Sequence, residues 1–208
     1  MENKKGLLVI LSAPSGCGKD TLFKEICKTR NDCVESVSAT TRAPREGEVE
    51  GVNYFFKTED EFRKMIDNDG LLEYARYNNC YYGTPVDGVE KAIKDGKVCF
   101  LIIEVQGAQS IMKMRPDCVS IFLLPPSIEV LERRLHRRET NDPEDIKRRL
   151  ALAEYEIELS SLYKYKVVND DLNDAVNKVS EIIDKELELR NKNDQMGSER
   201  RIICLIQI

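Results

Sequence analysis

Short runs of apolar residues recur along the chain, and longer stretches with helical periodicity separate them. Four of the runs have the length and composition of buried β-strands, at Leu7–Leu11, Val98–Val105, Val119–Leu124 and Tyr165–Val168. Strands that are apolar at consecutive positions are typical of parallel sheets, which are covered on both faces. The pattern therefore predicts an α/β protein with a central parallel sheet.

Apolar residues recur every three or four positions in the stretches around these runs. The helices predicted in this way are Lys19–Lys28, Glu59–Asp67, Pro85–Lys94, Gly107–Lys113, Ile128–Arg138, Glu144–Leu162 and Asp171–Leu189. Because helices alternate with strands over most of the chain, we expect right-handed crossovers between parallel strands.

Residues 34–84 depart from this alternation. They carry strand candidates at Val34–Ser38, Val52–Phe56 and Leu71–Tyr77, in hairpin-like spacing around a helix that Thr58 would cap. We therefore expect a small mixed α+β lobe, inserted into a core of residues 1–33 and 85–190. Beyond the core, residues 191–201 are polar and expected to fray, while residues 201–208 (RIICLIQI) are apolar. This tail could add an edge strand, dock on the body or mediate self-association.

Composition narrows the functional classes. A length of 208 residues fits one domain, or one domain with small inserted lobes, and the formal net charge of −5 does not favour a nucleic-acid-binding surface. We expect a cytoplasmic protein without a membrane segment, because no apolar run is long enough to span a bilayer and the start, MENKKG, lacks a signal-peptide core. The seven cysteines are odd in number and include no CxxC pair, which argues against a disulfide framework or zinc site.

The segment LLVILSAPSGCGKDTL, from Leu7 to Leu22, predicts a phosphate-binding loop. A strand, a glycine-containing turn and a helix N-terminus aim backbone N–H groups at an anion, and Lys19 can reach the outer phosphates. The P-loop pattern asks for Gly at position 13 and Ser or Thr at position 20, where this chain has Ala13 and Asp20, with Thr21 next. A turn that binds nothing is the alternative. Cys17 is either a reactive thiol at a helix N-terminus or a filler of the loop.

Arginines form a second signal. Arg133, Arg134, Arg137 and Arg138 crowd the end of one predicted helix, and Arg148 and Arg149 follow after a break at residues 140–143. Phosphoryl transfer needs cations over the transferred oxygens, and arginine supplies a permanent, fork-shaped charge. We interpret the two arms as a lid at about residues 134–149, although a solvated helix face is the common explanation of such a run.

The inserted lobe offers a third set of polar groups. Arg42 and Arg45 could clamp a phosphate, Tyr54 and Tyr82 offer hydroxyls, and Glu73 interrupts an apolar strand. A carboxylate can accept two hydrogen bonds from N1–H and the exocyclic amine of guanine, which adenine does not offer in that arrangement. Together these residues predict a pocket for a nucleoside monophosphate.

From Leu7 to about Leu187 the sequence resembles guanylate kinase. The motifs that carry the resemblance are SAPSGCGK, SATTRAPREGEVEGVNYFF, LLEYARYNNCYYGT, IIEVQGAQ, RRLHRRE, IKRRL and VVNDDL. The resemblance implies a P-loop three-layer fold with a GMP-binding lobe and a helical lid. It also implies the reaction of ATP with GMP (or dGMP) to ADP and GDP, with Mg²⁺ accompanying ATP.

The resemblance also implies roles for individual residues. ATP would be bound by Ala13, Pro14, Ser15, Gly16, Cys17, Gly18, Lys19, Asp20, Thr21 and Asn169, the last beside adenine. GMP would be bound through its phosphate by Arg42, Arg45, Tyr54 and Tyr82, and through its base by Ser38, Glu73, Thr84 and Glu104. The catalytic cations would be Lys19, Arg42, Arg134, Arg138 and Arg149.

The chain departs from the family at two positions near the metal. Asp20 stands where members often have Ser, and Ile102 stands where many have an acidic residue, two positions before Glu104. We hypothesise that the changes offset each other and that Asp20 contacts Mg²⁺, directly or through water. Glu139 replaces a common Gly in the lid, with little effect expected.

Two alternatives remain open. One is another nucleoside monophosphate kinase, against which Glu73, Ser38 and Thr84 favour guanine. The other is a catalytically silent guanylate-kinase-like module that binds proteins, which tends to lose the loop lysine or the lid arginines. The sequence does not decide between a monomer and a homodimer.

Overall fold

The central sheet has five parallel strands in the order β2–β7–β1–β8–β9. The structure is a computed structural model that describes residues 6–77, 79–136 and 143–206. The strands are β1 (Leu7–Ser12), β2 (Cys33–Glu35), β7 (Val98–Ile102), β8 (Val119–Leu124) and β9 (Tyr165–Val168). β1 lies at the centre, and all six of its residues are buried.

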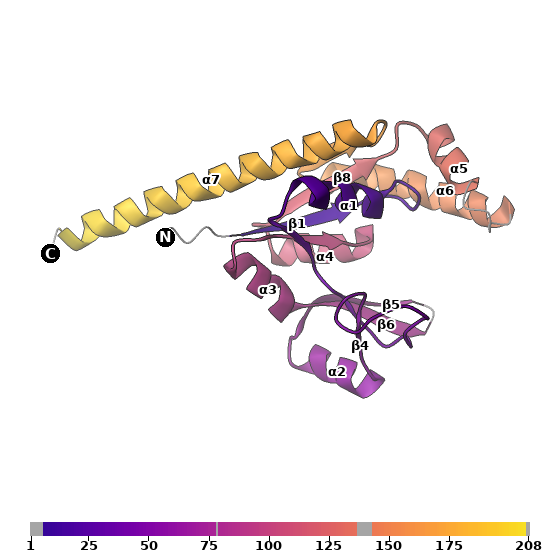
Figure 1. Cartoon of the computed structure of the whole chain (residues 1–208), viewed down its shortest axis with the longest axis horizontal. Helices are drawn as coiled ribbons and strands as arrows, with labels where there is room; N and C mark the ends of the chain where they lie inside the picture. The colour runs from indigo at the N-terminus through magenta and orange to yellow at the C-terminus, as the bar shows by residue number, and fades with distance from the viewer. Residues whose placement is uncertain (1–5, 78, 137–142, 207–208) are drawn as a thin grey trace.

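Helices cover both faces of this sheet (Figure 1). One face packs against α1 (Lys19–Thr29), α5 (Ile128–His136) and α7 (Leu172–Ile206), and the other against α3 (Val86–Lys94) and α4 (Val105–Met114). Successive side chains of β1 point to opposite faces of the sheet, so that Val9 and Leu11 face α1 while Leu8 and Ile10 face α4. The predicted α/β fold with a parallel sheet is confirmed.

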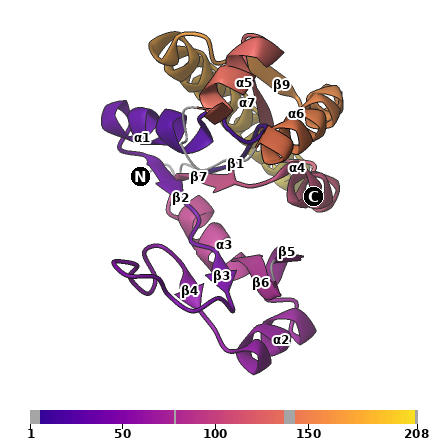
Figure 2. The same ribbon diagram turned by 90° about the vertical axis from the view of Figure 1, so that its right-hand side faces the viewer.

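A second, mixed sheet lies apart from the first, beyond α3 (Figures 1 and 2). Its strands, in spatial order, are β4 (Phe55–Phe56), β3 (Ala39–Thr40), β6 (Cys80–Pro85) and β5 (Leu71–Tyr77). Helix α2 (Glu59–Asp67) stacks Phe62 on Tyr81 with 5.3 Å between ring centroids. The predicted cap is present, since Thr58 and Glu61 form a reciprocal capping box.

Two strands expected in residues 34–84 differ from the prediction. The strand predicted at Val34–Ser38 ends at Glu35 and belongs to the central sheet, where β2 pairs with β7. The strand predicted at Val52–Phe56 is only two residues long, because the chain reverses at Gly51, whose φ is 73°, and the N–H of Val52 bonds to the carbonyl oxygen of Val49.

The chain after β8 forms α5, then α6 (Pro143–Glu158) and a 3₁₀ turn, η1 (Leu159–Leu162). The final helix α7 continues to Ile206, so the fraying expected from residue 191 and the edge strand considered for the tail are wrong for the described residues (Figure 1). Lys, Glu, Gln and Arg in this stretch favour a helix, and no proline interrupts it. None of the helices in the described ranges is long and apolar enough to span a bilayer.

Candidate active site

The turn between β1 and α1 has the geometry of an anion-binding loop. Gly16 and Gly18 adopt φ angles of 91° and 88°, a left-handed conformation that residues with a Cβ rarely adopt. At Gly16 a Cβ would also lie 2.9 Å from Cδ2 of Leu135. Gly18 precedes α1 and has no side chain to cap it, so the N–H groups of the first turn are left for a ligand.

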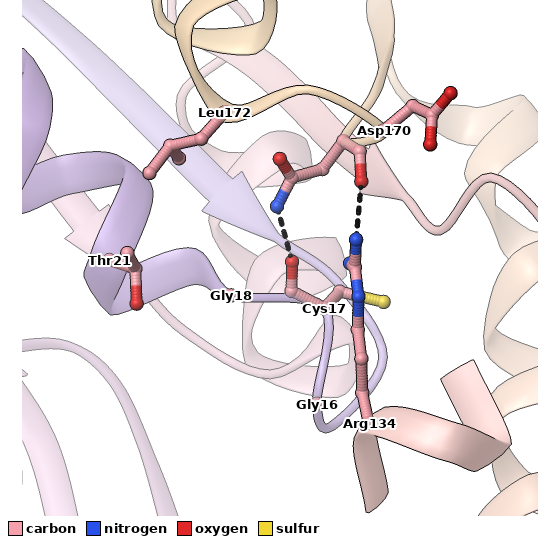
Figure 3. A pocket seen from close by; sticks show the side chains of 8 residues that line it. Gly16, Cys17, Gly18, Thr21, Arg134, Asp170 and Leu172 are labelled. Atoms are coloured by element: carbon pink, nitrogen blue, oxygen red, sulfur yellow. Dashed lines mark hydrogen bonds between the residues drawn. The ribbon is translucent and has the colours of Figure 1, made fainter. Parts of the chain in front are cut away.

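Asn169 holds this loop through a hydrogen bond, and Arg134 in turn bonds to Asn169 (dashed lines in Figure 3). The buried side-chain amide of Asn169 donates to the carbonyl oxygen of Cys17 at 2.7 Å, and Arg134 donates to the backbone oxygen of Asn169 at 2.9 Å. The resulting pocket measures about 310 Å³, and its lining residues are Gly16, Cys17, Gly18, Thr21, Arg134, Asn169, Asp170 and Leu172. Its size and position suit a nucleotide base next to a phosphate loop.

Lys19 joins the loop to the end of β7. Its ammonium donates to the carbonyl oxygen of Ala13 at 2.8 Å and lies 3.4 Å from Oε1 of Glu104. Glu104 directly precedes α4 and is largely exposed. The contact therefore brings together a residue predicted to bind ATP and one predicted to bind GMP, at the carboxyl ends of neighbouring strands, where α/β sheets bind ligands.

A buried carboxylate lies near Lys19. Glu156 of α6 is only 8% exposed. Burial, assisted by the nearby charge of Glu104 and opposed by Lys19, raises its pKa to about 7. The charge state of Glu156 in α6 therefore depends on the charge of Lys19 in the phosphate loop.

The second arginine arm also reaches the loop. Arg149 of α6 donates from Nη2 to the hydroxyl of Ser15, while its Nη1 lies 4.0 Å from Asp145. The two arginines come from helices on either side of the break; Arg149 contacts the turn directly, and Arg134 reaches it through Asn169. Arg138 and Glu139, also singled out in the sequence, lie outside the described residues.

The remaining loop residues differ in exposure. Asp20 and Thr21 are exposed at the start of α1, whereas Pro14 accepts a bond within the turn from the N–H of Cys17. Cys17 is fully buried, and burial raises the pKa of its thiol to about 12. This favours the loop-filling interpretation, because burial disfavours the thiolate that a reactive cysteine requires.

In the lobe, Arg42 is held at the centre of an aromatic and acidic cluster. It donates to Oε1 of Glu48 at 2.7 Å and lies 5.4 Å from the ring centroid of Tyr54, which contacts Tyr82 edge to face at 6.1 Å. The hydrogen bond from Arg42 holds the pKa of Glu48 below its ordinary value. The backbone N–H of Arg45 donates to the other oxygen of Glu48 at 2.7 Å, and the Arg45 residue is exposed.

Glu73 and Thr84 form a second polar pair in the lobe. Thr84 is 1% exposed and donates to Oε1 of Glu73 at 2.8 Å. Burial raises the pKa of Glu73, and the bond from Thr84 lowers it. Ser38, also predicted to contact the base, accepts at its backbone oxygen a hydrogen bond from the N–H of Phe55.

Sequence reasoning missed two polar residues of this region. Glu48 lies inside the arginine-containing motif, three positions after Arg45, and orders both arginines. Glu156 lies three residues after buried Ala153, on the apolar side of a predicted helix. A carboxylate in that position is the signal that could have revealed it.

Comparisons with known proteins agree with this geometry. The sequence profile of the family described as guanylate kinase matches residues 5–186. Guanylate kinase of Rickettsia typhi is 47% identical over 179 residues, which cover 86% of this chain and 91% of the relative. Guanylate kinase of Bacillus cereus is 47% identical over 184 residues, which cover 88% of this chain and 90% of the relative.

A solved structure gives the same result for the fold. The crystal structure of guanylate kinase from Anaplasma phagocytophilum matches with a TM-score of 0.67 and 34% identity, over 88% of this chain and 87% of that one. Because the family profile and these relatives match nearly the whole chain, the chain belongs to the guanylate kinase family.

Proposed function

We propose that the chain transfers the γ-phosphoryl group of ATP to GMP or dGMP, with ADP and GDP or dGDP as products. The observation that carries this proposal is the contact of Lys19 with Glu104, 3.4 Å apart, which joins the phosphate loop to the side of the site that faces the lobe. A donor phosphate at Lys19 and an acceptor at Glu104 would therefore be neighbours. Family membership supports the same reaction.

On the donor side, the backbone N–H groups from Ser15 to Lys19 would bind the phosphates of ATP. Arg134 and Arg149, already directed at this loop, would neutralise the transferred group, and Arg138 would join them. Since Asn169 uses its amide to hold Cys17, its role toward adenine would be to shape the pocket.

On the acceptor side, Arg42, Arg45, Tyr54 and Tyr82 would bind the phosphate of GMP. Arg42 is paired with Glu48, so the phosphate of GMP would have to share the guanidinium with this carboxylate or displace it from the pair. Ser38, Glu73, Thr84 and Glu104 would surround the base. The hydrogen bond from Thr84 orients Glu73, whose carboxylate would accept from guanine.

The transfer itself requires no covalent intermediate on the protein. An oxygen of the GMP phosphate forms a bond to the γ-phosphorus while the bond from that phosphorus to the β–γ bridging oxygen breaks. The protein aligns the two nucleotides and neutralises the oxygens in flight. We propose that the lobe of residues 34–84 and the lid of about residues 134–149 close over the nucleotides and exclude water, which would otherwise hydrolyse ATP.

The residues at the start of α1 fit Mg²⁺ bound together with ATP. Within the described ranges, no group of three or more His, Cys, Asp or Glu side chains could hold a metal by itself. Mg²⁺ commonly uses one or two carboxylates plus phosphate oxygens and water, and the exposed carboxylate of Asp20 next to Lys19 supplies such a ligand. When bound, the ion would add positive charge beside the β- and γ-phosphates.

A substrate panel tests the proposed acceptor. ADP formation from ATP is measured with GMP, dGMP, AMP and UMP under identical conditions. We expect GMP and dGMP to support transfer and AMP and UMP to support little. Transfer to AMP or UMP at the rate seen with GMP would indicate a different monophosphate kinase, and GMP binding without transfer to any acceptor would indicate a silent module.

A further inference from the structure

The carboxylate of Glu73 is confined on two sides by residues from different parts of the fold. Its Oε1 accepts from Thr84 of β6 at 2.8 Å. Its Oε2 lies against the first turn of α4, next to Gly107. β5 and β6 belong to the mixed sheet and α4 covers the central sheet, so Glu73 lies where the lobe meets the core.

Gly107 leaves the room that this carboxylate occupies. A Cβ at position 107 would lie 3.1 Å from Oε2, 3.5 Å from Cδ and 3.8 Å from Cγ of Glu73. The first distance is shorter than an ordinary van der Waals contact between carbon and oxygen, so the carboxylate would have to move. Alanine at this position would displace the end of one side chain rather than backbone.

The backbone gives no reason for glycine at this position. Gly107 lies inside α4 and does not have a left-handed φ, and glycine inside a helix is less favourable than alanine. A helix N-terminus also favours a nearby negative charge, and Glu73 lies against the first turn of α4. Gly107 thus lets the Glu73 carboxylate approach α4 closely, although glycine lowers the stability of the helix.

We propose that Gly107 is a positioning residue for guanine recognition, which fixes the Glu73 carboxylate between Thr84 and the first turn of α4. The inference rests on the proposed function, because it assigns Gly107 a role through the base-binding group of that site. It predicts that a methyl group at position 107 weakens binding of guanine nucleotides and leaves the ATP side unchanged.

The test compares Gly107→Ala with Gly88→Ala. Gly88 also lies within a helix, α3, and a Cβ there would meet nothing within 4 Å, so this variant controls for the change in helix propensity. The dissociation constant of GMP is measured by calorimetry, together with KM for GMP and ATP. We expect Gly107→Ala to raise both GMP constants about 3- to 10-fold, the size of a weakened hydrogen bond, and Gly88→Ala to leave them unchanged.

A double-mutant cycle with Glu73→Ala separates positioning from general packing. If Gly107 acts through Glu73, Gly107→Ala changes GMP affinity less than about twofold when Glu73 is already absent. The ratio of the affinities for GMP and inosine monophosphate, which lacks the 2-amino group, should also decrease in the single variant Gly107→Ala. Thermal unfolding of each variant confirms that the fold is retained.

Two outcomes would overturn the inference. One is a GMP affinity for Gly107→Ala equal to that of Gly88→Ala, and the other is an equal loss in the presence and absence of Glu73. Failure of the proposed function is a separate result, because it would appear as absence of GMP-dependent ADP formation in the unaltered chain, while calorimetry still reports GMP binding.

Discussion

The side-chain amide of Asn169 donates a 2.7 Å hydrogen bond to the carbonyl oxygen of Cys17, across 152 positions of sequence. The bond ties the end of β9 to the phosphate loop, and the backbone oxygen of Asn169 in turn accepts from Arg134. One buried residue therefore fixes both the shape of the loop and the direction of a lid arginine.

Replacing Asn169 with Ala should weaken ATP binding more than GMP binding. The change leaves the buried oxygen of Cys17 without its donor, which costs about 1–3 kcal/mol, and loosens the loop backbone. KM for ATP and KM for GMP measure the two sides separately. Lys166→Ala, at an exposed position of β9, serves as the control. Unchanged KM for ATP would contradict the role of this bond.

Replacing Lys19 with Ala should slow transfer severely and leave GMP binding largely intact. The ammonium lies at the loop, 2.8 Å from the oxygen of Ala13, and loss of a cation that stabilises the transferred group lowers the rate by roughly 10²–10³-fold. Steady-state rates and GMP calorimetry are the measurements. Lys28→Ala removes an exposed lysine from the same helix and should have no effect. Full activity of Lys19→Ala would refute the role.

Replacing Asp20 with Ser tests the position of the metal-site carboxylate. Ile102 packs in the cluster that also holds Phe23 of α1, so Asp20 at the start of α1 and Ile102 on β7 belong to the same side of the sheet. We expect Asp20→Ser to raise the Mg²⁺ concentration needed both for activity and for ATP binding measured by calorimetry. Asp20→Asn keeps the size and removes the charge. Unchanged Mg²⁺ dependence together with unchanged turnover in Asp20→Ser would refute the hypothesis that Asp20 contacts Mg²⁺.

Replacing Glu156 with Gln should change how stability depends on pH. Burial raises the pKa of Glu156 from 4.5 to about 7, so the folded chain keeps this proton over a range where the unfolded chain has lost it. The contribution of this carboxyl to the free energy of unfolding is fully present below its pKa in the unfolded chain. It is lost as the pH rises through about 7. The loss amounts to about 3 kcal/mol, from 1.36 kcal/mol for each pKa unit.

The amide of Gln is neutral at every pH, so Glu156→Gln should gain stability relative to the parent between about pH 5 and pH 8. Urea denaturation at both pH values measures the difference, and Glu154→Gln, at an exposed position of α6, is the matched control. A difference in unfolding free energy that is the same at both pH values would contradict the assignment.

Local sequence patterns correctly predicted the helices and strands whose bounds are set by residues close in the sequence. The strands Val119–Leu124 and Tyr165–Val168 and the helix Glu59–Asp67 have the predicted bounds, because apolar runs, periodicity and the Thr58 cap are visible in the sequence. The predicted end of α7 was wrong, because a polar stretch of good helix formers has the same sequence pattern whether it frays or stays helical.

Site features that depend on distant contacts could not be predicted in the same way. The motifs identified Glu73, yet its contact with Gly107 arises only when α4 packs against β5. Arg149, which follows the break, was predicted to neutralise the transferred group, and its contact with Ser15 of the loop was not visible in the sequence. The periodicity of α6 places Glu156 on its apolar side, but the proximity of this carboxylate to Lys19 became evident only in the structure.

The most direct test of phosphoryl transfer is to measure ADP and GDP together in a reaction of the purified chain with ATP, Mg²⁺ and GMP. Both products should form in equal amounts, ADP formation without GMP should be a small fraction of that rate, and Lys19→Ala should form both roughly 10²–10³-fold more slowly. ADP that accumulates without GDP, or no ADP from a chain that still binds GMP, would contradict it.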